Sequence, residues 1–373
     1  MESVKNSLIM MGNKLSNIIR PSAEIAFAQE LEELKKIDKH PKPEQWQLSP
    51  WAVLQFILGA KLSNGMVITP KYFGQKKIIE LAIASLLSER ALLLTGIPGT
   101  AKTWLSEHLA AAISGDSSLL IQGTSGTHED VIKYGWNYAS LIAKGPSLEA
   151  LIPSPIMNAM NIGSIARIEE LSRIPTETQD ALISILSEKT MSIPELNQQV
   201  QAQRGFNIIA TANDLDRGLY EMSSALKRRF NIVNMPLPQT IEEEIEIVTY
   251  RVNQLGRQME IPLSELKQKQ IHKLVGLFRE LREGKSQDGK TKVKPTNVQL
   301  SPAIAISIVH EARIFAYYFD KNEIDATHMA PGLINALRQE NKDELAILQE
   351  YNETILKKRV EYKDWYSSIK SNL

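Results

Sequence analysis

The sequence predicts an α/β domain of three layers, in which a parallel sheet lies between helices, followed by an all-α domain. The apolar run Ala91-Leu92-Leu93-Leu94 leads through a glycine-containing loop into the helical pattern of Trp104 to Ile113. Further short apolar runs end in polar residues, and beyond Pro238 the apolar residues recur at helical spacing. Strands that alternate with helices are typical of a parallel sheet covered on both faces.

Length and charge limit the classes of protein that fit. The chain has 373 residues, enough for two domains with a sizeable core. Lys and Arg together number 43, as do Asp and Glu, and this balance disfavours binding to nucleic acid or anionic membranes through bulk electrostatics. The chain has no cysteine, which excludes disulfides and thiolate metal sites, and its six histidines have no metal-ligand spacing, so we expect no structural metal.

Residues 1–70 are expected to form a leader and a helical segment. Residues 1–20 lack a hydrophobic core followed by a cleavage site, and no later run could span a bilayer, so we expect a cytoplasmic location. Pro21 to Lys39 is predicted as a helix that a Pro-rich break ends. Ser49 to Gly59 is predicted as a short helix that packs on the next domain, and Tyr72 to Leu87 contains another helix.

The loop after the first predicted strand has the composition of a phosphate-binding loop. Its residues are Gly96, Ile97, Pro98, Gly99, Thr100, Ala101, Lys102 and Thr103. In such a loop the backbone amides surround the β-phosphate, Lys102 reaches the β- and γ-phosphates, and the Thr103 hydroxyl holds Mg²⁺. Ala101 stands where a second glycine is common, and we expect it to enter the helix at negative φ. The alternative is an ordinary Gly/Pro turn, which the flanking strand and helix disfavour.

The segments after the first helix alternate between predicted strands and turns. Ser118 to Gln122 is predicted as a second buried strand, and Gly123 to Met160, rich in Gly, Ser, Thr and Pro, as a long functional or mobile loop. Thr176 to Gln179 has the pattern of a capping box that opens a helix over Asp180 to Lys189. Met191 to Arg204 alternates in the manner of a hairpin.

Two adjacent carboxylates end the strand predicted over Ser164 to Glu170. After a phosphate-binding loop we expect such a strand to supply one acid for the Mg²⁺ shell and another that polarises the attacking water. We assign Glu169 to the metal shell and Glu170 to the water. Because Glu is one methylene longer than the usual Asp, Glu169 is expected to act through water or a shifted strand. The alternative is a solvated acidic pair at a strand end.

A further buried strand is predicted over Phe206 to Asn213. Its terminal amide, Asn213, should lie beside Glu170 because the carboxyl ends of parallel strands face the ligand. The next helix ends in three consecutive basic residues, Lys227, Arg228 and Arg229, before a strand over 231–235. Taken alone, these cations would simply complement the helix dipole.

Pro236 and Pro238 mark a domain boundary, after which every predicted element is a helix. A capping box at Thr240 opens the first of them, which ends at Gly256. The others are predicted over Leu263 to Arg282, Ser301 to Phe319, Glu323 to Gln339, and Lys342 towards Ser371. The polar loop Gly284 to Thr296 is predicted to be disordered. The apolar seam of the long last helix suggests packing against a neighbouring molecule as well as within the domain.

Five ordered motifs resemble those of the MoxR-type AAA+ ATPases, over roughly residues 70–310: Tyr72-Phe73-Gly74-Gln75, Gly-Ile-Pro-Gly-Thr-Ala-Lys-Thr, Ile-Glu-Glu-Leu-Ser-Arg-Ile-Pro, Ile-Ala-Thr-Ala-Asn and Ala-Leu-Lys-Arg-Arg-Phe. The resemblance implies a P-loop AAA+ nucleotide-binding domain of αβα layers over residues 71–238 and a helical lid with C-terminal helices over 239–373. It also implies a ring, usually a hexamer, that binds ATP and Mg²⁺ between subunits. Hydrolysis would remodel a protein client, often with a partner that carries a von Willebrand factor A domain.

The same resemblance implies roles for residues outside the loop. Asn213 would be sensor 1, and Arg228 or Arg229 the arginine finger offered to the γ-phosphate of the neighbouring subunit. Such a finger makes hydrolysis depend on assembly. The Gly74-Gln75 pair would approach the adenine, and we count Trp104, directly after the loop, among the nucleotide-binding residues.

Three departures from the family pattern suggest slow or partner-dependent hydrolysis. Glu169 replaces an Asp, Ser172 stands where Asn is common, and Ala303 occupies the place of the sensor 2 arginine. A weakly hydrolysing ATP-binding switch or scaffold therefore remains the alternative to a remodelling ATPase. A nucleic-acid motor is disfavoured by the zero net charge. Tyr134 and Trp136 are candidates to line a central pore or simply to pack.

Overall fold

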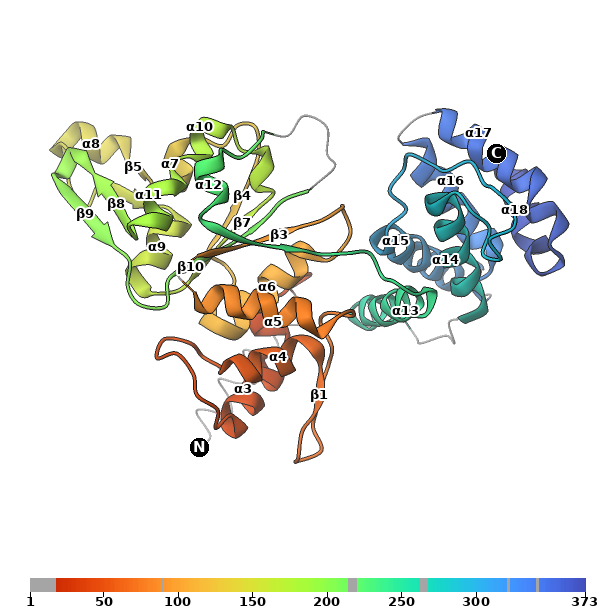
Figure 1. The fold of residues 1–373 in the computed structure, drawn as a ribbon, viewed down its shortest axis with the longest axis horizontal. Helices are drawn as coiled ribbons and strands as arrows, with labels where there is room; N and C mark the ends of the chain where they lie inside the picture. The colour runs from red at the N-terminus through yellow and green to blue at the C-terminus, as the bar shows by residue number, and fades with distance from the viewer. Residues whose placement is uncertain (1–17, 89, 214–219, 262–267, 321–322, 340–341) are drawn as a thin grey trace. The chain divides into compact units, whose positions relative to one another are not determined.

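The computed structural model describes residues 18–88, 90–213, 220–261, 268–320, 323–339 and 342–373 (Figure 1). The chain divides into two compact units, one of Met1–Gly96 with Ala101–Met235 and one of Ile97–Thr100 with Pro236–Leu373. Residues 1–17 of the predicted leader lie outside the described residues. Within the described ranges, no helix combines the length and apolar character that crossing a bilayer requires.

The described part of the first unit is built on a five-stranded parallel sheet. Its strands, in spatial order, are β11 (Phe230–Asn234), β3 (Ala91–Thr95), β10 (Asn207–Thr211), β7 (Ile165–Glu169) and β4 (Leu120–Gln122). Successive side chains of β3 point to opposite faces, so that Leu92 and Leu94 are buried in one core and Leu93 in another. Helices cover both faces, and the predicted three-layer α/β fold is confirmed.

One face of the sheet is covered by the helices that precede and follow β3 in the chain (Figure 1). These are α3 (Ala28–Ile37), α4 (Pro50–Leu58), α5 (Lys76–Leu87) and α6 (Lys102–Ser114). The Ser49 hydroxyl caps α4 by accepting a hydrogen bond from the N–H of Ala52 (3.2 Å). Phe56 of α4 is buried in the same core as Leu105 of α6, which confirms the predicted packing of the short helix.

The single helix predicted over Pro21 to Lys39 is wrong, because the chain forms two helices there, α2 (Ala23–Ala26) and α3. Phe27 separates them with a non-helical backbone (φ −117°, ψ 25°). Its ring packs edge-on against Phe56, with centroids 6.0 Å apart, and the Lys71 ammonium lies 4.2 Å from its centroid. The helix is interrupted at Phe27, where the ring packs on Phe56. The spacing of apolar residues in the sequence does not reveal this interruption.

The other face carries α9 (Pro155–Ile162), α10 (Thr176–Gln179), α11 (Leu182–Ser187) and the predicted hairpin of β8 (Thr190–Ile193) and β9 (Gln198–Gln201). The capping box predicted at Thr176 is wrong. Thr176 is already the first residue of α10, and its hydroxyl donates to the carbonyl of Glu221 (3.1 Å) instead of capping. Pro175 occupies the N-cap position instead (φ −52°, ψ 141°), and its side chain has no acceptor with which to cap the helix.

The long loop predicted over Gly123 to Met160 is also wrong, because most of this segment is regular. It contains α7 (Glu129–Ile132), β5 (Tyr134–Trp136), α8 (Tyr138–Lys144), β6 (Leu151–Pro153) and α9, and β5 pairs with β6. Ile132, Ile156 and Met160 are buried in the core on this face of the sheet. These widely spaced apolar anchors hold the segment in place, although its turn-rich composition resembles that of a loop.

The two aromatic residues considered for a pore lie in β5 and pack within the protomer. Tyr134 and Trp136 are half-buried against the same core, and the Tyr134 hydroxyl donates to the Glu195 carboxylate (2.9 Å). Partial burial raises the pKa of Tyr134 to about 12, so this proton stays in place at neutral pH. The structure therefore favours a packing role. The exposed apolar side chains of this region include Ile142 of α8, Leu148 and Ile152 of β6.

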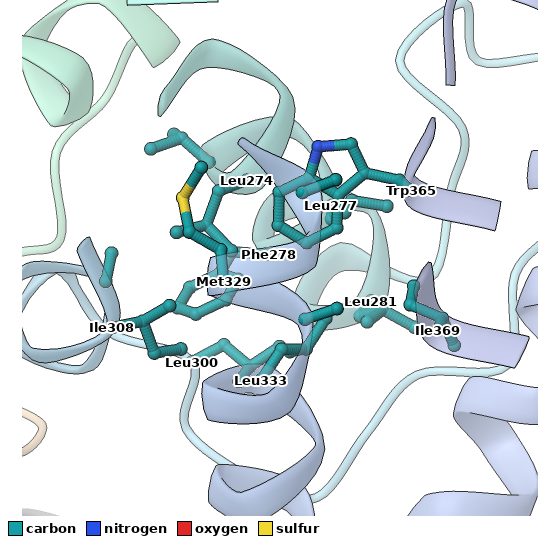
Figure 2. Close-up of a cluster of buried hydrophobic side chains, with 14 of the residues drawn as sticks. Leu274, Leu277, Phe278, Leu281, Leu300, Ile308, Met329, Leu333, Trp365 and Ile369 are labelled. Atoms are coloured by element: carbon teal, nitrogen blue, oxygen red, sulfur yellow. The ribbon is translucent and has the colours of Figure 1, made fainter. Parts of the chain in front are cut away.

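The described part of the second unit is helical except for connecting segments. Its helices are α13 (Ile241–Gln258), α14 (Gln268–Glu283), α15 (Pro302–Phe315), a π-helical turn (Ala316–Asp320), α16 (Ala326–Arg338), α17 (Lys342–Thr354) and α18 (Lys363–Asn372). Figure 2 shows Phe278 of α14, Leu333 of α16 and Trp365 of α18 meeting in its core. The Thr240 hydroxyl accepts from the N–H of Glu243 (3.1 Å), but the Glu243 carboxylate accepts from the N–H of Gln239 (2.9 Å), so only half of the predicted capping box forms. The predicted start of α14 at Leu263 lies outside the described residues.

The long terminal helix predicted from Lys342 is interrupted. Two 3₁₀ turns, Leu356–Lys358 and Val360–Tyr362, separate α17 from α18. The interruption lets Leu356 and Tyr362 both reach the core, whereas Val360 of the predicted seam is 88% exposed. An unbroken helix could not direct α18 back onto the same core. The spacing of apolar residues does not show that the helix must be interrupted here.

The loop predicted to be disordered, Gly284 to Thr296, is folded. Lys285 and Lys292 form an antiparallel bridge, and the N–H of Ser286 donates to the carbonyl of Thr291 (2.9 Å). Val293 is buried in the core of the unit. One buried valine and a closed turn therefore order a segment whose composition is otherwise polar.

Candidate nucleotide site

The glycine-containing loop joins β3 to α6, as the sequence predicts. Gly96 and Gly99 have φ values of 140° and 83°, which favour glycine. The Thr100 hydroxyl donates to the carbonyl of Ile97 (2.9 Å), and the buried Lys102 ammonium donates to the carbonyl of Gly96 (2.8 Å). The loop thus closes around the side chain of its own lysine, at the positive end of α6.

Ala101 does not have the negative φ that we expect from the sequence. Its backbone is left-handed (φ 65°, ψ 24°), and α6 begins only after it, at Lys102. The loop must reverse direction immediately before the helix, and this turn needs the left-handed conformation that a glycine would adopt freely. For an alanine this conformation costs roughly 1–2 kcal/mol. Strain of this kind is typical of functional loops.

Replacing Ala101 with Gly should therefore stabilise the protein. We expect Ala101→Gly to raise the free energy of unfolding by about 0.5–1 kcal/mol, because the relief of strain exceeds the entropy that glycine adds to the unfolded chain. The matched control is Ala111→Gly within α6, which should destabilise by about 1 kcal/mol or more. Denaturant unfolding of both variants measures the difference. A less stable Ala101→Gly protein would contradict the conclusion that the backbone of Ala101 is strained.

The two adjacent carboxylates at the end of β7 have different surroundings. Glu169 is the last residue of the strand and is 1% exposed. Glu170 follows in a left-handed conformation (φ 55°), its N–H donates to the Thr211 hydroxyl (3.0 Å), and its carboxylate pairs with Arg173. The half-buried Glu170 remains within reach of solvent. The alternative of a solvated acidic pair does not describe Glu169.

Within the described residues, four groups donate hydrogen bonds to the Glu169 carboxylate. Oε2 accepts from the hydroxyls of Thr103 (2.8 Å) and Thr211 (2.6 Å). Oε1 accepts from the Ser106 hydroxyl and from Nη2 of Arg167 (2.8 Å). Glu169 therefore touches the loop threonine, as the assignment of Glu169 and Thr103 to one metal shell requires.

Sequence reasoning missed Arg167, for which the sequence holds a signal, and Gly123, whose role only the structure shows. Arg167 interrupts the apolar run of β7 two residues before Glu169, a spacing that places both on the same face of a strand. Gly123 follows β4, and its N–H donates to the carbonyl of Glu169 (2.7 Å). A Cβ atom there would lie 2.4 Å from the Glu170 carbonyl oxygen, so a glycine is needed to keep the acidic turn in place.

The remaining predicted residues lie at the ends of other elements. Asn213 comes two residues after β10, at the carboxyl edge of the sheet where Glu170 follows the adjacent β7. Gly74 and Gln75 are exposed directly before α5, and Gly74 has a φ of 146°. Trp104 lies in the first turn of α6, where its ring packs on His108 with centroids 4.2 Å apart.

The two candidate finger residues differ in their contacts. Arg229 is half-buried, and its guanidinium donates to the hydroxyl of Ser187 (2.9 Å) and the carbonyl of Ala225 (2.7 Å). Arg228, at the end of α12 (Ser224–Lys227), is exposed. No hydrogen bond or ion pair among the described residues uses the Arg228 side chain. The geometry leaves Arg228 available to another molecule.

The residues at this edge suit Mg²⁺ only together with a nucleotide. Among the described residues, no group of three His, Cys, Asp or Glu side chains could hold a metal alone. The Thr103 hydroxyl donates a hydrogen bond to Glu169, which leaves its oxygen lone pairs for a hard cation. Mg²⁺ commonly takes one or two protein ligands and completes its shell with phosphate oxygens and water. The donor set fits that pattern.

Two family descriptions match successive parts of the chain. Residues 91–230 match "AAA domain (dynein-related subfamily)", and residues 242–367 match "YehL-like AAA+ ATPase C-terminal domain". The chain is 39% identical to YehL of Escherichia coli (strain K12) over 346 residues, which cover 92% of this chain and 94% of YehL. It is 28% identical to SH1500 of Staphylococcus haemolyticus (strain JCSC1435) over 145 residues, which cover 39% of this chain and 54% of that protein.

Solved structures show a similar fold. The match to NtrX from Brucella abortus, in its complex with ATP, has a TM-score of 0.50 at 14% sequence identity. It covers 79% of this chain and 63% of the NtrX chain, so it spans less than two thirds of that protein. At this identity the similarity is one of fold.

Proposed function

The chain belongs to the YehL-like AAA+ ATPases, and from that premise we propose that it binds and hydrolyses ATP in a ring of identical subunits to remodel a protein client. One observation carries the proposal. The hydroxyl of Thr103, directly after the loop lysine, lies 2.8 Å from a buried carboxylate of the strand that also delivers Glu170. This hydrogen bond connects the glycine-containing loop directly to the acidic end of β7.

In the proposed reaction the loop amides and Lys102 bind the phosphates of ATP, and the Thr103 hydroxyl holds Mg²⁺. When bound there, Mg²⁺ would neutralise charge on the β- and γ-phosphates. Glu170 polarises the attacking water, which its carboxylate can reach from the half-buried position beyond β7. Asn213 at the neighbouring strand end orients the same water or the γ-phosphate. This arrangement catalyses by positioning and electrostatics.

Assembly completes the site in this proposal. Arg228 of one subunit would contact the γ-phosphate bound by its neighbour, since its exposed side chain is available. The ring would be of the MoxR type, usually a hexamer, and a protein with a von Willebrand factor A domain is the expected partner. The motifs quoted above support this assignment. A weakly hydrolysing switch is the second candidate, favoured by Ala303, which leaves the first turn of α15 without a cation.

A binding titration tests the first step of the proposal. We expect ATP with Mg²⁺ to bind the wild-type protein, and Lys102→Ala to weaken binding by about ten- to a hundredfold, because a charge-assisted hydrogen bond contributes about 1.5–3 kcal/mol. The exposed Lys144 of α8 offers a matched control, and Lys144→Ala should leave affinity unchanged. Equal ATP affinity in wild type and Lys102→Ala would contradict the assigned site.

A further inference from the structure

Several aromatic side chains are exposed together at the end of α15. This aromatic patch consists of Phe315, Tyr317, Tyr318 and Phe319, whose exposed fractions range from 43% to 76%. Elsewhere in the described part of the chain, the exposed aromatic side chains are Tyr138 and Tyr220. Apolar side chains that are exposed singly need no explanation, whereas a contiguous group of them indicates an interaction site.

A π-helical turn places these rings on the outside of the second unit. Ala312 and Ala316 are buried in the core of this unit. If α15 continued as an α-helix, Phe319 would share their buried face, because residues three, four and seven apart lie on one side of such a helix. The turn over Ala316–Asp320 is wider than an α-helical turn, and Phe319 is exposed instead. π-helical turns are rare and frequently lie at functional sites.

Contacts with α16 hold the aromatic patch in place. The ring centroids of Phe315 and Phe319 are 5.3 Å apart, and the Phe315 centroid lies 5.8 Å from that of His328, whose side chain is 3% exposed. Nε2 of His328 lies 3.0 Å from Oδ2 of Asp320, the last residue of the turn, and Nδ1 lies 2.9 Å from Oδ1 of Asp325. His328 therefore ties the turn to the start of α16. A preorganised surface loses little conformational entropy when a partner binds.

The accessible charges around the aromatic patch are acidic. The side chains of Asp320 and Asp325 are 45% and 49% exposed, so both carboxylates face solvent as well as α16. Glu311 is exposed one helical turn before the patch. The described residues between positions 311 and 328 contain one Lys or Arg, Arg313, which is buried and donates to backbone carbonyls inside the unit. Lys321 lies outside the described residues.

We propose that the aromatic patch docks an arginine-bearing segment of a partner protein. An arginine guanidinium stacks on aromatic faces and pairs with carboxylates through its planar fork, so the rings and the acids would contact the same side chain. The acids disfavour nucleic acid and anionic membranes as occupants. A symmetric contact between two copies of the patch would bring like charges together. The inference goes beyond the proposed function, because no residue of the patch belongs to the nucleotide site.

A peptide titration tests the docking surface. The probes are short fluorescent peptides of Arg-Gly repeats and of Lys-Gly repeats, and the readout is fluorescence anisotropy at physiological salt. We expect the wild-type protein to bind the arginine peptide about tenfold more tightly than the lysine peptide, and Tyr318→Ser/Phe319→Ser to lower that affinity about tenfold or more. Glu311→Gln should lower it about two- to threefold. The matched control, Tyr138→Ser, removes an exposed ring from α8 and should leave the affinity unchanged.

The arginine peptide binding the wild type and Tyr318→Ser/Phe319→Ser equally, or binding neither, would overturn the inference. Tighter binding of a single-stranded oligonucleotide than of the peptide would overturn it as well. Because the removed rings are exposed, we expect the melting temperature of this variant to stay within about 2 °C of wild type. A larger fall would assign the rings to the fold. The mass of the ATP-bound variant should match that of the wild type, and a variant that no longer assembles would show that the patch contacts a second copy instead.

Discussion

Replacing Arg228 with Ala should abolish nearly all ATP turnover while each subunit still binds ATP. An arginine finger given in trans accelerates phosphoryl transfer by roughly three to five decades. Arg228 is exposed at the end of α12, whereas the guanidinium of Arg229 is already bound to Ser187 and Ala225 of its own subunit. We therefore expect Arg229→Ala to reduce stability more than turnover. Steady-state hydrolysis and ATP affinity of both variants measure the contrast.

Mixing inactive subunits tests whether the arginine acts in trans. Arg228→Ala subunits retain Lys102 and Glu170, and Glu170→Gln subunits retain Arg228. In a mixed ring some interfaces combine an intact loop and glutamate with an intact arginine. Part of the turnover should therefore return on mixing two variants that are inactive alone. Full inactivity of the mixture, or an active Arg228→Ala protein beside an inactive Arg229→Ala protein, would contradict the assignment of the finger.

The second large effect is expected at Glu170. The Glu170→Gln change keeps the size of the side chain but removes the charge that polarises water, so turnover should fall by about two to four decades. ATP binding should remain, and the variant should hold unhydrolysed ATP. The exposed Glu177 of α10 is a matched control, and Glu177→Gln should hydrolyse ATP at the wild-type rate. Nucleotide extracted from the purified variant and single-turnover kinetics distinguish the outcomes.

Near-normal hydrolysis by Glu170→Gln would mean that an acid other than Glu170 polarises the attacking water. Among the described residues at this sheet edge, the other candidate is Glu169, which is buried and hydrogen bonded on both oxygens. A buried carboxylate without access to water is poorly placed to activate it. This difference in surroundings is why the two adjacent acids are assigned different roles.

The strands and the loop could be predicted because their signals are local. A run such as Ala91-Leu92-Leu93-Leu94 is buried on both faces only in a covered parallel sheet, and the loop after it determines where the helix begins. The placement of Glu169 and Glu170 at the end of β7 could be predicted in the same way, because the two acids directly follow a short apolar run. The conformation of Ala101 could not be predicted in this way, because the direction in which the loop must turn is set by the positions of β3 and α6.

The elements that sequence reasoning missed depend on distant contacts. Phe27 breaks a helix because its ring packs on Phe56, and the terminal helix is interrupted so that Tyr362 reaches the core of the second unit. Arg167 is an extreme case. A charged residue within an apolar strand opposes local propensity, and only the partner carboxylate and the carbonyls near α6 explain it. Such conflicts between local and tertiary preference are expected at functional sites.

The most direct test of a shared catalytic site is the dependence of ATP hydrolysis on protein concentration, with the mass of the ATP-bound protein measured over the same range. We predict that turnover per subunit rises with the fraction of protein in rings and reaches a plateau when assembly is complete. A turnover per subunit that is constant from monomer to ring would contradict a site completed by Arg228 of the neighbouring subunit. Rings that bind ATP without turnover at any concentration would favour the switch.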